Sequence, residues 1–182
     1  MSDNRKILLL SANPKGTSKL RLDEEVREIE EGLRRSKQRS HFTIETSTAV
    51  RYRDLRRVIL DHEPHIVHFS GHGEGQEELV FEDETGRLKF VNAVALSGLF
   101  ELVADQVECV LLNACYSQAQ AIAIAQHIPY VVVGTHRLFQ IHCHRQKITF
   151  KRPLNIDITP ILRIKPLRDK SVNTRKLPIR RR

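Results

Sequence analysis

The sequence predicts a single α/β domain, a three-layer sandwich in which helices cover both faces of a mostly parallel sheet. Three observations predict it. Short continuous apolar runs, typical of strands buried on both faces, alternate with segments whose apolar residues recur at helical spacing. Turn clusters containing Gly, Pro, Asn and Ser separate many of these segments. A chain of 182 residues, 40% of them hydrophobic, is also long enough for one compact core.

A strand, a helix and a second strand are predicted over residues 6–47. KILLLSA (6–12) is a short apolar run that ends in the turn cluster NPKGTS. FTIETS (42–47) fits the second strand. Between them, the apolar residues recur at intervals of four, three and four, which places them on one face of a surface helix: Leu22, Val26, Ile29 and Leu33.

A second helix, a third strand and a β-hairpin follow. The helix is predicted over 51–62, with an inward face formed by Leu55, Val58 and Ile59. Pro64 precedes the third strand, HIVHFS (65–70), which continues into Gly71-His72-Gly73. The hairpin is predicted from the runs LVFED and RLKFV, which flank a short loop that contains glycine.

The alternation of helices and strands continues to residue 134. An amphipathic helix is predicted over 92–104, where the apolar positions are Val94, Leu99, Leu102 and Val103. ECVLLNA (108–114) is expected to be the fourth parallel strand, SQAQAIAIAQH (117–127) the next helix, and PYVVVG (129–134) the fifth strand.

The net charge of +8 is concentrated at the C-terminal end. Residues 1–134 contain 16 Lys and Arg against 20 Asp and Glu, whereas residues 135–182 contain 14 against 2. The basic segment has no glycine and ends in RKLPIRRR. Such segments are usually solvated extensions or non-specific contacts for anions, so we expect no specific nucleic-acid partner. We therefore divide the chain into a domain core, 1–134, and an atypical basic tail, 135–182.

Hydropathy and cysteine usage predict a cytoplasmic protein. No run of about 18 apolar residues occurs, and ILLL near the N-terminus is followed at once by polar residues, so we expect neither a membrane span nor a signal peptide. The three cysteines are an odd number without paired CxxC spacing, which favours free thiols. HRLFQIHCHR (136–145) lacks a second ligand group at standard spacing, so we expect no metal and no other cofactor.

Two polar sequences follow the third and fourth strands. SGHG (70–73) and NACYS (113–117) fall at carboxyl ends of parallel strands, where the functional loops of such sheets lie. If these strands are neighbours, His72 and Cys115 lie across one crevice, as a thiol activated by an imidazole requires. The backbone amides of Gly73 and Cys115 could then donate to an oxyanion.

The cysteines themselves have two interpretations. Cysteine in an apolar strand is most often a core residue, which is our interpretation of Cys109 within ECVLL. Cys115 follows the polar Asn113 at a strand end, and its position alone is equally compatible with a structural and a nucleophilic role.

IVHFSGHG, ECVLLNACYSQAQAIAIAQHIPYVVVG and the N-terminal ILLLSANPKGTSKLRLDEEVREIEEGL together resemble the CHAT domain, a caspase-like cysteine peptidase domain of clan CD that is common in bacteria, especially cyanobacteria. The resemblance spans about residues 5–134. It implies a caspase-like sandwich and a catalytic dyad of His72 and Cys115 that hydrolyses protein or peptide substrates through a thioester. It also implies a proteolytic effector in bacterial defence or programmed cell death, with TPR or NACHT-type recruitment partners.

The sequence departs from the family pattern after Gly134. Family members usually continue into a long alanine-rich helix, whereas THRLFQIHCHRQKITFKRPL contains no glycine and no matching amphipathic pattern. We expect a truncated or frame-shifted C-terminal part that lacks a wall of the substrate cleft. The alternative function is therefore a catalytically inactive scaffold or regulatory interaction protein.

A second alternative is a nucleotide or flavin module. The first strand, the loop SANPKGTS (11–18) and the following helix resemble a flavodoxin-type phosphate site, where backbone amides at a helix start bind an anion. The loop lacks both GxxxxGK[ST] and GxGxxG, so this signal is weak.

Overall fold

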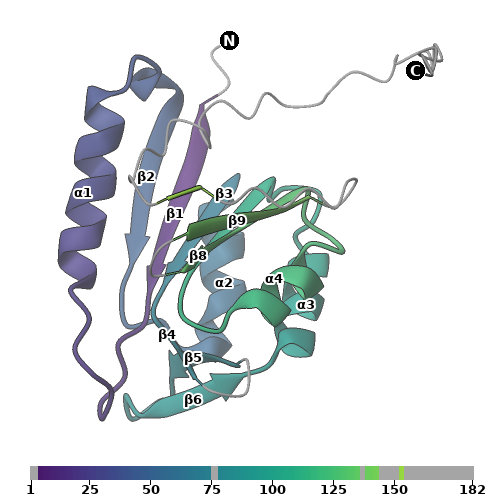
Figure 1. Ribbon diagram of the computed structural model, residues 1–182. Helices are drawn as coiled ribbons and strands as arrows, with labels where there is room; N and C mark the ends of the chain where they lie inside the picture. Colours follow the sequence, from purple (N-terminus) through teal and green to yellow (C-terminus); the bar gives the residue numbers. More distant parts are fainter. Residues whose placement is uncertain (1–3, 75–77, 136–137, 144–151, 154–182) are drawn as a thin grey trace, which may run out of the picture.

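The computed structural model describes residues 4–74, 78–135, 138–143 and 152–153 (Figure 1). Among them, seven strands form the main sheet, in the order β10-β9-β8-β7-β3-β1-β2. Strands β2, β1, β3, β7 and β8 run parallel, whereas β9 is antiparallel to β8 and β10 to β9. The strands are β1 Arg5–Ser11, β2 Phe42–Ser47, β3 Ile66–Ser70, β7 Cys109–Asn113, β8 Tyr130–Thr135, β9 Leu138–Cys143 and β10 Arg152–Pro153.

Helices cover both faces of this sheet (Figure 1). Because side chains alternate along a strand, Ile7 and Leu9 of β1 pack in one cluster with α1, and Leu8 and Leu10 pack in the other with α2, α3 and α4. The helices are α1 Leu22–Arg35, α2 Tyr52–His62, α3 Ala93–Glu101 and α4 Gln118–Ile124, with a 3₁₀ turn at Arg39–His41. The predicted three-layer α/β sandwich is confirmed, and it agrees with the caspase-like arrangement.

A second, three-stranded sheet lies in the connection between β3 and β7. It contains β4 His72–Glu74, β5 Glu78–Glu82 and β6 Leu88–Val91. The predicted hairpin is β5 and β6, whose connecting turn places Gly86 at a φ of +77°, a left-handed conformation that suits glycine. β4 was not predicted, because its three residues are polar or small and show no alternation of apolar and polar side chains. It pairs with β5 and contains His72 and Gly73.

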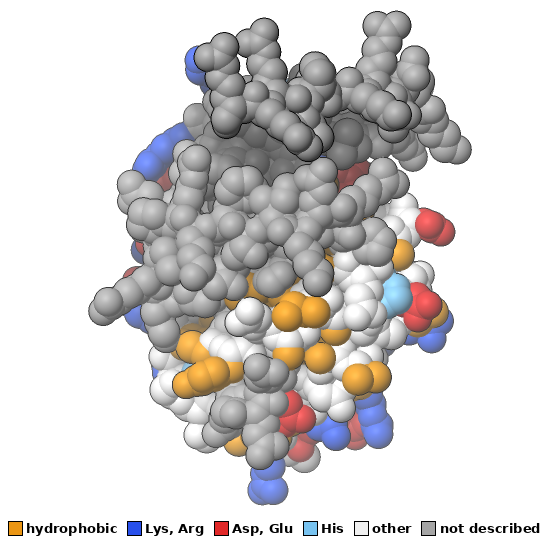
Figure 2. All heavy atoms as spheres, turned by 45° about the vertical axis from the view of Figure 1, so that its right-hand side comes forward, with side chains coloured by type: hydrophobic (Ala, Val, Ile, Leu, Met, Phe, Trp, Pro, Cys, Tyr) orange, Lys and Arg blue, Asp and Glu red, His pale blue; other side chains and the backbone are white. Residues whose placement is uncertain are grey.

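The apolar face of α3 differs from the prediction. Val94 and Leu102 are 79% and 63% exposed, so their placement on the apolar face was wrong. The helix instead buries Leu96, Leu99 and Phe100, which recur at the i, i+3, i+4 spacing of one helical face. Figure 2 shows the resulting exposed hydrophobic side chains on the side of the molecule that carries α3 and α4.

Beyond Gly134, β9 extends the sheet antiparallel to β8. The division into a core at 1–134 and a tail at 135–182 stays a prediction, because most of the tail, including residues 154–182, lies outside the described residues. The prediction that the histidine-rich segment 136–145 holds no metal also stays a prediction, because residues 136–137 and 144–145 lie outside the described residues. In the part of the chain that is described, no helix has the length and apolar character needed to cross a membrane.

Candidate active site

The two polar sequences meet at the carboxyl edge of the main sheet. β3 and β7 are parallel neighbours, with Ser70 opposite Asn113 in the last register position. Just beyond it, the Gly71 amide donates to the Asn113 carbonyl at 3.3 Å. The segments that follow the two strands, called the two loops below, carry His72 (at the start of β4) and Cys115, and they leave adjacent strands at the same edge, as the sequence predicted.

Gly73 lies directly against the backbone of Cys115. A Cβ atom built on Gly73 would lie 1.6 Å from the Cys115 carbonyl oxygen and 2.8 Å from its carbonyl carbon, so this contact requires glycine. The two loops thus touch through their main chains. The dyad roles of His72 and Cys115, and the oxyanion roles of the Gly73 and Cys115 amides, stay predictions.

The His72 ring is oriented by a backbone group. Its Nε2 lies 2.8 Å from the carbonyl oxygen of Ser18, in the segment between β1 and α1. A carbonyl only accepts hydrogen bonds, so Nε2 carries the proton in this contact, and in the neutral ring Nδ1 holds the lone pair. Ser18 could not be identified from the sequence, because any residue supplies a backbone carbonyl.

The two described cysteines have different environments, and neither is in a disulfide. Cys109 is buried, and burial, together with the nearby charge of Glu108, raises the pKa of its thiol to about 12. A thiol with that pKa is unreactive at neutral pH, so the interpretation of Cys109 as a core residue is confirmed. Cys115 is partly exposed at the end of its strand.

The turn after Cys115 is held in an uncommon conformation. Tyr116 has a φ of +54° and an exposed side chain, and the Ser117 hydroxyl donates to the Ala114 carbonyl at 2.8 Å. A left-handed backbone is unusual for a bulky residue and typically costs about 1–3 kcal/mol, so the surrounding structure enforces this turn.

A side-chain network centred on Glu25 of α1 lies at the same strand ends. One carboxylate oxygen, Oε1, accepts from the Ser70 hydroxyl and from the Asn113 amide, each at 2.7 Å. The same oxygen lies 2.8 Å from His68 Nε2, which also lies 2.8 Å from the Ser70 hydroxyl. Sequence reasoning missed Glu25 because an acidic residue on a surface helix is usually solvated.

This network differs from a hydrolase triad. In a triad the acid and the nucleophilic hydroxyl contact opposite nitrogens of the imidazole. Here Glu25 and Ser70 both contact Nε2 of His68. Ser70 is therefore not arranged as a nucleophile activated by this histidine.

The pKa of Glu25 is lowered from its ordinary value of 4.5. Burial acts to raise it, but the hydrogen bond and charge of His68, with the bonds from Ser70 and Asn113, together outweigh burial. A lowered folded-state pKa contributes stability above the unfolded-state value, and this contribution disappears as the pH falls through the folded-state value.

We accordingly expect the stability advantage of the wild type over Glu25→Gln to be largest near neutral pH and to shrink as the pH falls below 4.5. Urea unfolding of both proteins between about pH 3 and about pH 7 measures the difference. A difference in unfolding free energy that stays constant over this range would contradict the assignment of a lowered pKa to Glu25.

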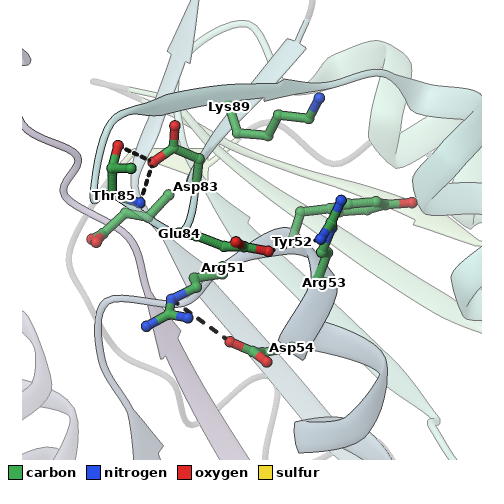
Figure 3. A pocket seen from close by; sticks show the side chains of 9 residues that line it. Arg51, Tyr52, Arg53, Asp54, Asp83, Glu84, Thr85 and Lys89 are labelled. Atoms are coloured by element: carbon green, nitrogen blue, oxygen red, sulfur yellow. Dashed lines mark hydrogen bonds and ion pairs between the residues drawn. The ribbon is translucent and has the colours of Figure 1, made fainter.

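A pocket of about 600 Å³ lies between the start of α2 and the β5–β6 turn (Figure 3). It is lined by Arg51, Tyr52, Arg53, Asp54, Glu82, Asp83, Glu84, Thr85 and Lys89. Much of its charge is paired internally, since Arg53 contacts Glu84 at 2.7 Å and Arg51 contacts Asp54 at 3.9 Å. Neither His72 nor Cys115 lines it, so we do not assign the substrate to this pocket.

The residues after β1 do not fit a phosphate site. The order β2-β1-β3-β7-β8 matches that of flavodoxin-like sheets, so topology alone leaves the flavin alternative open. The first turn of α1, however, contains Asp23, Glu24 and Glu25, which would repel an anion. The Asn13 amide also already donates to a Glu82 carboxylate oxygen at 3.3 Å. These contacts argue against a flavin or nucleotide phosphate here.

Comparison with known proteins adds a family and two relatives. A family model described as the CHAT domain matches residues 2–149. A "Probable protease" of Gillisia limnaea (strain DSM 15749 / LMG 21470 / R-8282) is 23% identical over 137 residues, which cover 74% of this chain and 24% of the relative. A "Roc-COR-CHAT protease" from an unknown prokaryotic organism is 25% identical over 136 residues, which cover 71% of this chain and 13% of the relative. The chain thus spans a quarter or less of these relatives.

Among solved structures, the chain is similar to the C-terminal domain of the coenzyme A biosynthesis bifunctional protein CoaBC. The TM-score is 0.44 at 12% sequence identity, and the match covers 82% of this chain and 88% of that one. A likeness at this level supports no functional conclusion.

Proposed function

Since the chain belongs to the CHAT domain family, and two relatives are named as proteases, we propose that it is a cysteine-type endopeptidase acting through His72 and Cys115. The observation that carries the proposal is the contact between the two loops. Gly73, next to His72, touches the backbone of Cys115 at the shared edge of β3 and β7. Residues distant in sequence are thereby brought to one place, as thiol activation requires.

The proposed reaction has two steps. Nδ1 of His72 accepts the Cys115 proton, and the thiolate attacks the substrate carbonyl carbon to give a tetrahedral oxyanion. His72 returns this proton to the leaving amine as the carbon–nitrogen bond breaks, which leaves a thioester on Cys115. Water, deprotonated by His72, then hydrolyses the thioester and restores the thiol. The amides of Gly73 and Cys115 are the proposed donors to the oxyanion.

The proposed biological role is that of a proteolytic effector in bacterial defence or programmed cell death, acting on a protein or peptide in the cytoplasm. Protease relatives support a protein substrate. The two cysteines whose side chains the structure describes are outside any disulfide, which supports a reducing compartment. Recruitment through TPR or NACHT-type partners, which the CHAT resemblance implies, is also part of the proposal.

Covalent labelling tests the proposed dyad. In a Cys143→Ser background, a panel of peptidyl chloromethyl ketones should label Cys115 and leave the buried Cys109 unmodified. Labelling should vanish in Cys115→Ala and fall at least about a hundredfold in His72→Ala, because the thiol then lacks its base. Peptide mapping by mass spectrometry identifies the modified residue.

His127→Ala serves as the matched histidine control, since His127 contacts Ser97 at 3.1 Å and takes no part in the proposed dyad. Its labelling should equal that of the wild type. A folded protein that no member of the panel labels at Cys115 would refute the peptidase and favour the inactive scaffold or regulatory protein.

A further inference from the structure

We propose that Glu25 is a positioning residue that holds the ends of β3 and β7, and with them His72 and Cys115, in their working arrangement; this inference rests on the proposed peptidase function. Glu25 binds Ser70 and Asn113 through one oxygen, at 2.7 Å each. Ser70 lies two residues before His72, and Asn113 lies two residues before Cys115. A single carboxylate therefore connects the two strands at positions that each precede a proposed catalytic residue by two residues in the sequence.

The position of these bonds explains why they are needed. The register of β3 and β7 ends at Ser70 and Asn113, and just beyond it the Gly71 amide donates to the Asn113 carbonyl at 3.3 Å. The Glu25 bonds lie at this last register position. They fix the point from which both loops depart.

The environment strengthens the bonds to β3, whereas Asn113 on β7 is exposed. The side chains of Glu25 and His68 are only 21% and 14% exposed, and Ser70 is buried. Hydrogen bonds to an ionised carboxylate are roughly twice as strong as those between neutral groups, and partial exclusion of water increases them further. His68 adds a third contact to the same oxygen, at 2.8 Å. The carboxylate is thus held by β3 on one side and by β7 on the other.

The contact between Gly73 and Cys115 makes this arrangement sensitive to small shifts. With the Gly73 Cα packed against the Cys115 carbonyl, any change in the separation of the strand ends alters the relation of His72 to Cys115. A misplacement of about 1 Å can cost about a hundredfold in rate. Glu25 is assigned no chemical step, because its side chain contacts His68, Ser70 and Asn113.

The test compares Glu25→Ala and Glu25→Gln with Glu28→Ala and Glu28→Gln, since Glu28 is an exposed glutamate on the same helix. The readout is the second-order rate of Cys115 alkylation by iodoacetamide in the Cys143→Ser background. Glu25→Ala should react at least about tenfold more slowly than Glu28→Ala. Glu25→Gln keeps an acceptor oxygen at the same place, so it should recover part of the rate.

Two results would overturn the inference: equal rates in the folded Glu25→Ala and Glu28→Ala proteins, or a Glu25→Gln rate no higher than that of Glu25→Ala. If Glu25→Ala does not fold, the rate of Glu25→Gln against that of Glu28→Gln decides, with equal rates overturning the inference.

Hydrogen exchange separates this inference from the proposed function. If Cys115 in His72→Ala is alkylated at the wild-type rate, the proposed dyad is wrong. The alkylation rate then no longer reports on the role of Glu25. Amide exchange at residues 71–73 and 113–116 then decides the role of Glu25. Exchange should be faster at both segments in Glu25→Gln than in Glu28→Gln, and exchange that is unchanged at either segment would overturn the positioning role.

Discussion

Gly73→Ala should reduce covalent labelling of Cys115 at least about a hundredfold, because the added methyl group cannot be accommodated. The new Cβ would lie 1.6 Å from the Cys115 carbonyl oxygen and 2.8 Å from the carbonyl carbon. Both are backbone atoms, so no side-chain rotation relieves the overlap and the two loops must separate. The measurement is the labelling rate with the peptidyl electrophile, with far-ultraviolet circular dichroism to confirm folding.

Gly98→Ala is the matched control. Gly98 lies within α3, and a Cβ there would meet no atom within 4 Å. Because alanine is a better helix former than glycine, this variant should be more stable by up to about 1 kcal/mol and should be labelled at the wild-type rate. Wild-type labelling of Gly73→Ala would show that the loop contact is not needed for reactivity.

Phe81→Ala should cause the largest loss of stability among these variants, about 3–5 kcal/mol. Phe81 of β5 is 1% exposed, with ring centroids 4.7 Å from Phe69 of β3 and 6.2 Å from Tyr52 of α2. Its removal leaves a cavity where the small sheet packs on the main one. Urea unfolding followed by circular dichroism measures the change.

Phe90→Ala is the control for this variant, since Phe90 lies on the adjacent strand β6 and is 44% exposed. Its free energy of unfolding should fall by less than about 1.5 kcal/mol, because the Phe90 ring buries little apolar surface. Equal losses in the two variants would contradict the assignment of Phe81 to the junction between the sheets.

The main sheet was predictable because its strands are buried. Apolar runs such as Ile7–Leu10 and Val110–Leu112 have no polar alternation, which is the pattern of strands covered on both faces. The meeting of the SGHG and NACYS sequences was predictable for a geometric reason, since carboxyl ends of neighbouring parallel strands share an edge. What the sequence could not establish was that the two loops touch through Gly73.

The errors and omissions also have physical causes. Val94 and Leu102 are apolar but face outward, because hydrophobic character alone does not decide which helical face meets the core. β4 is too short to show a period. Glu25 has the composition of a solvated helix position, and only the tertiary structure places its carboxylate between Ser70 and Asn113.

The orientation of His72 by the Ser18 carbonyl has a consequence for genetics. A main-chain oxygen is present whatever residue occupies position 18, so replacing the Ser18 side chain leaves in place the oxygen that accepts the hydrogen bond from Nε2. Alanine scanning would therefore pass over this position without detecting it. Insertions or deletions in the segment between β1 and α1 are the changes that would displace this oxygen. If the orientation of His72 matters, the length of this segment should therefore be constrained, whereas the residue type at position 18 should not.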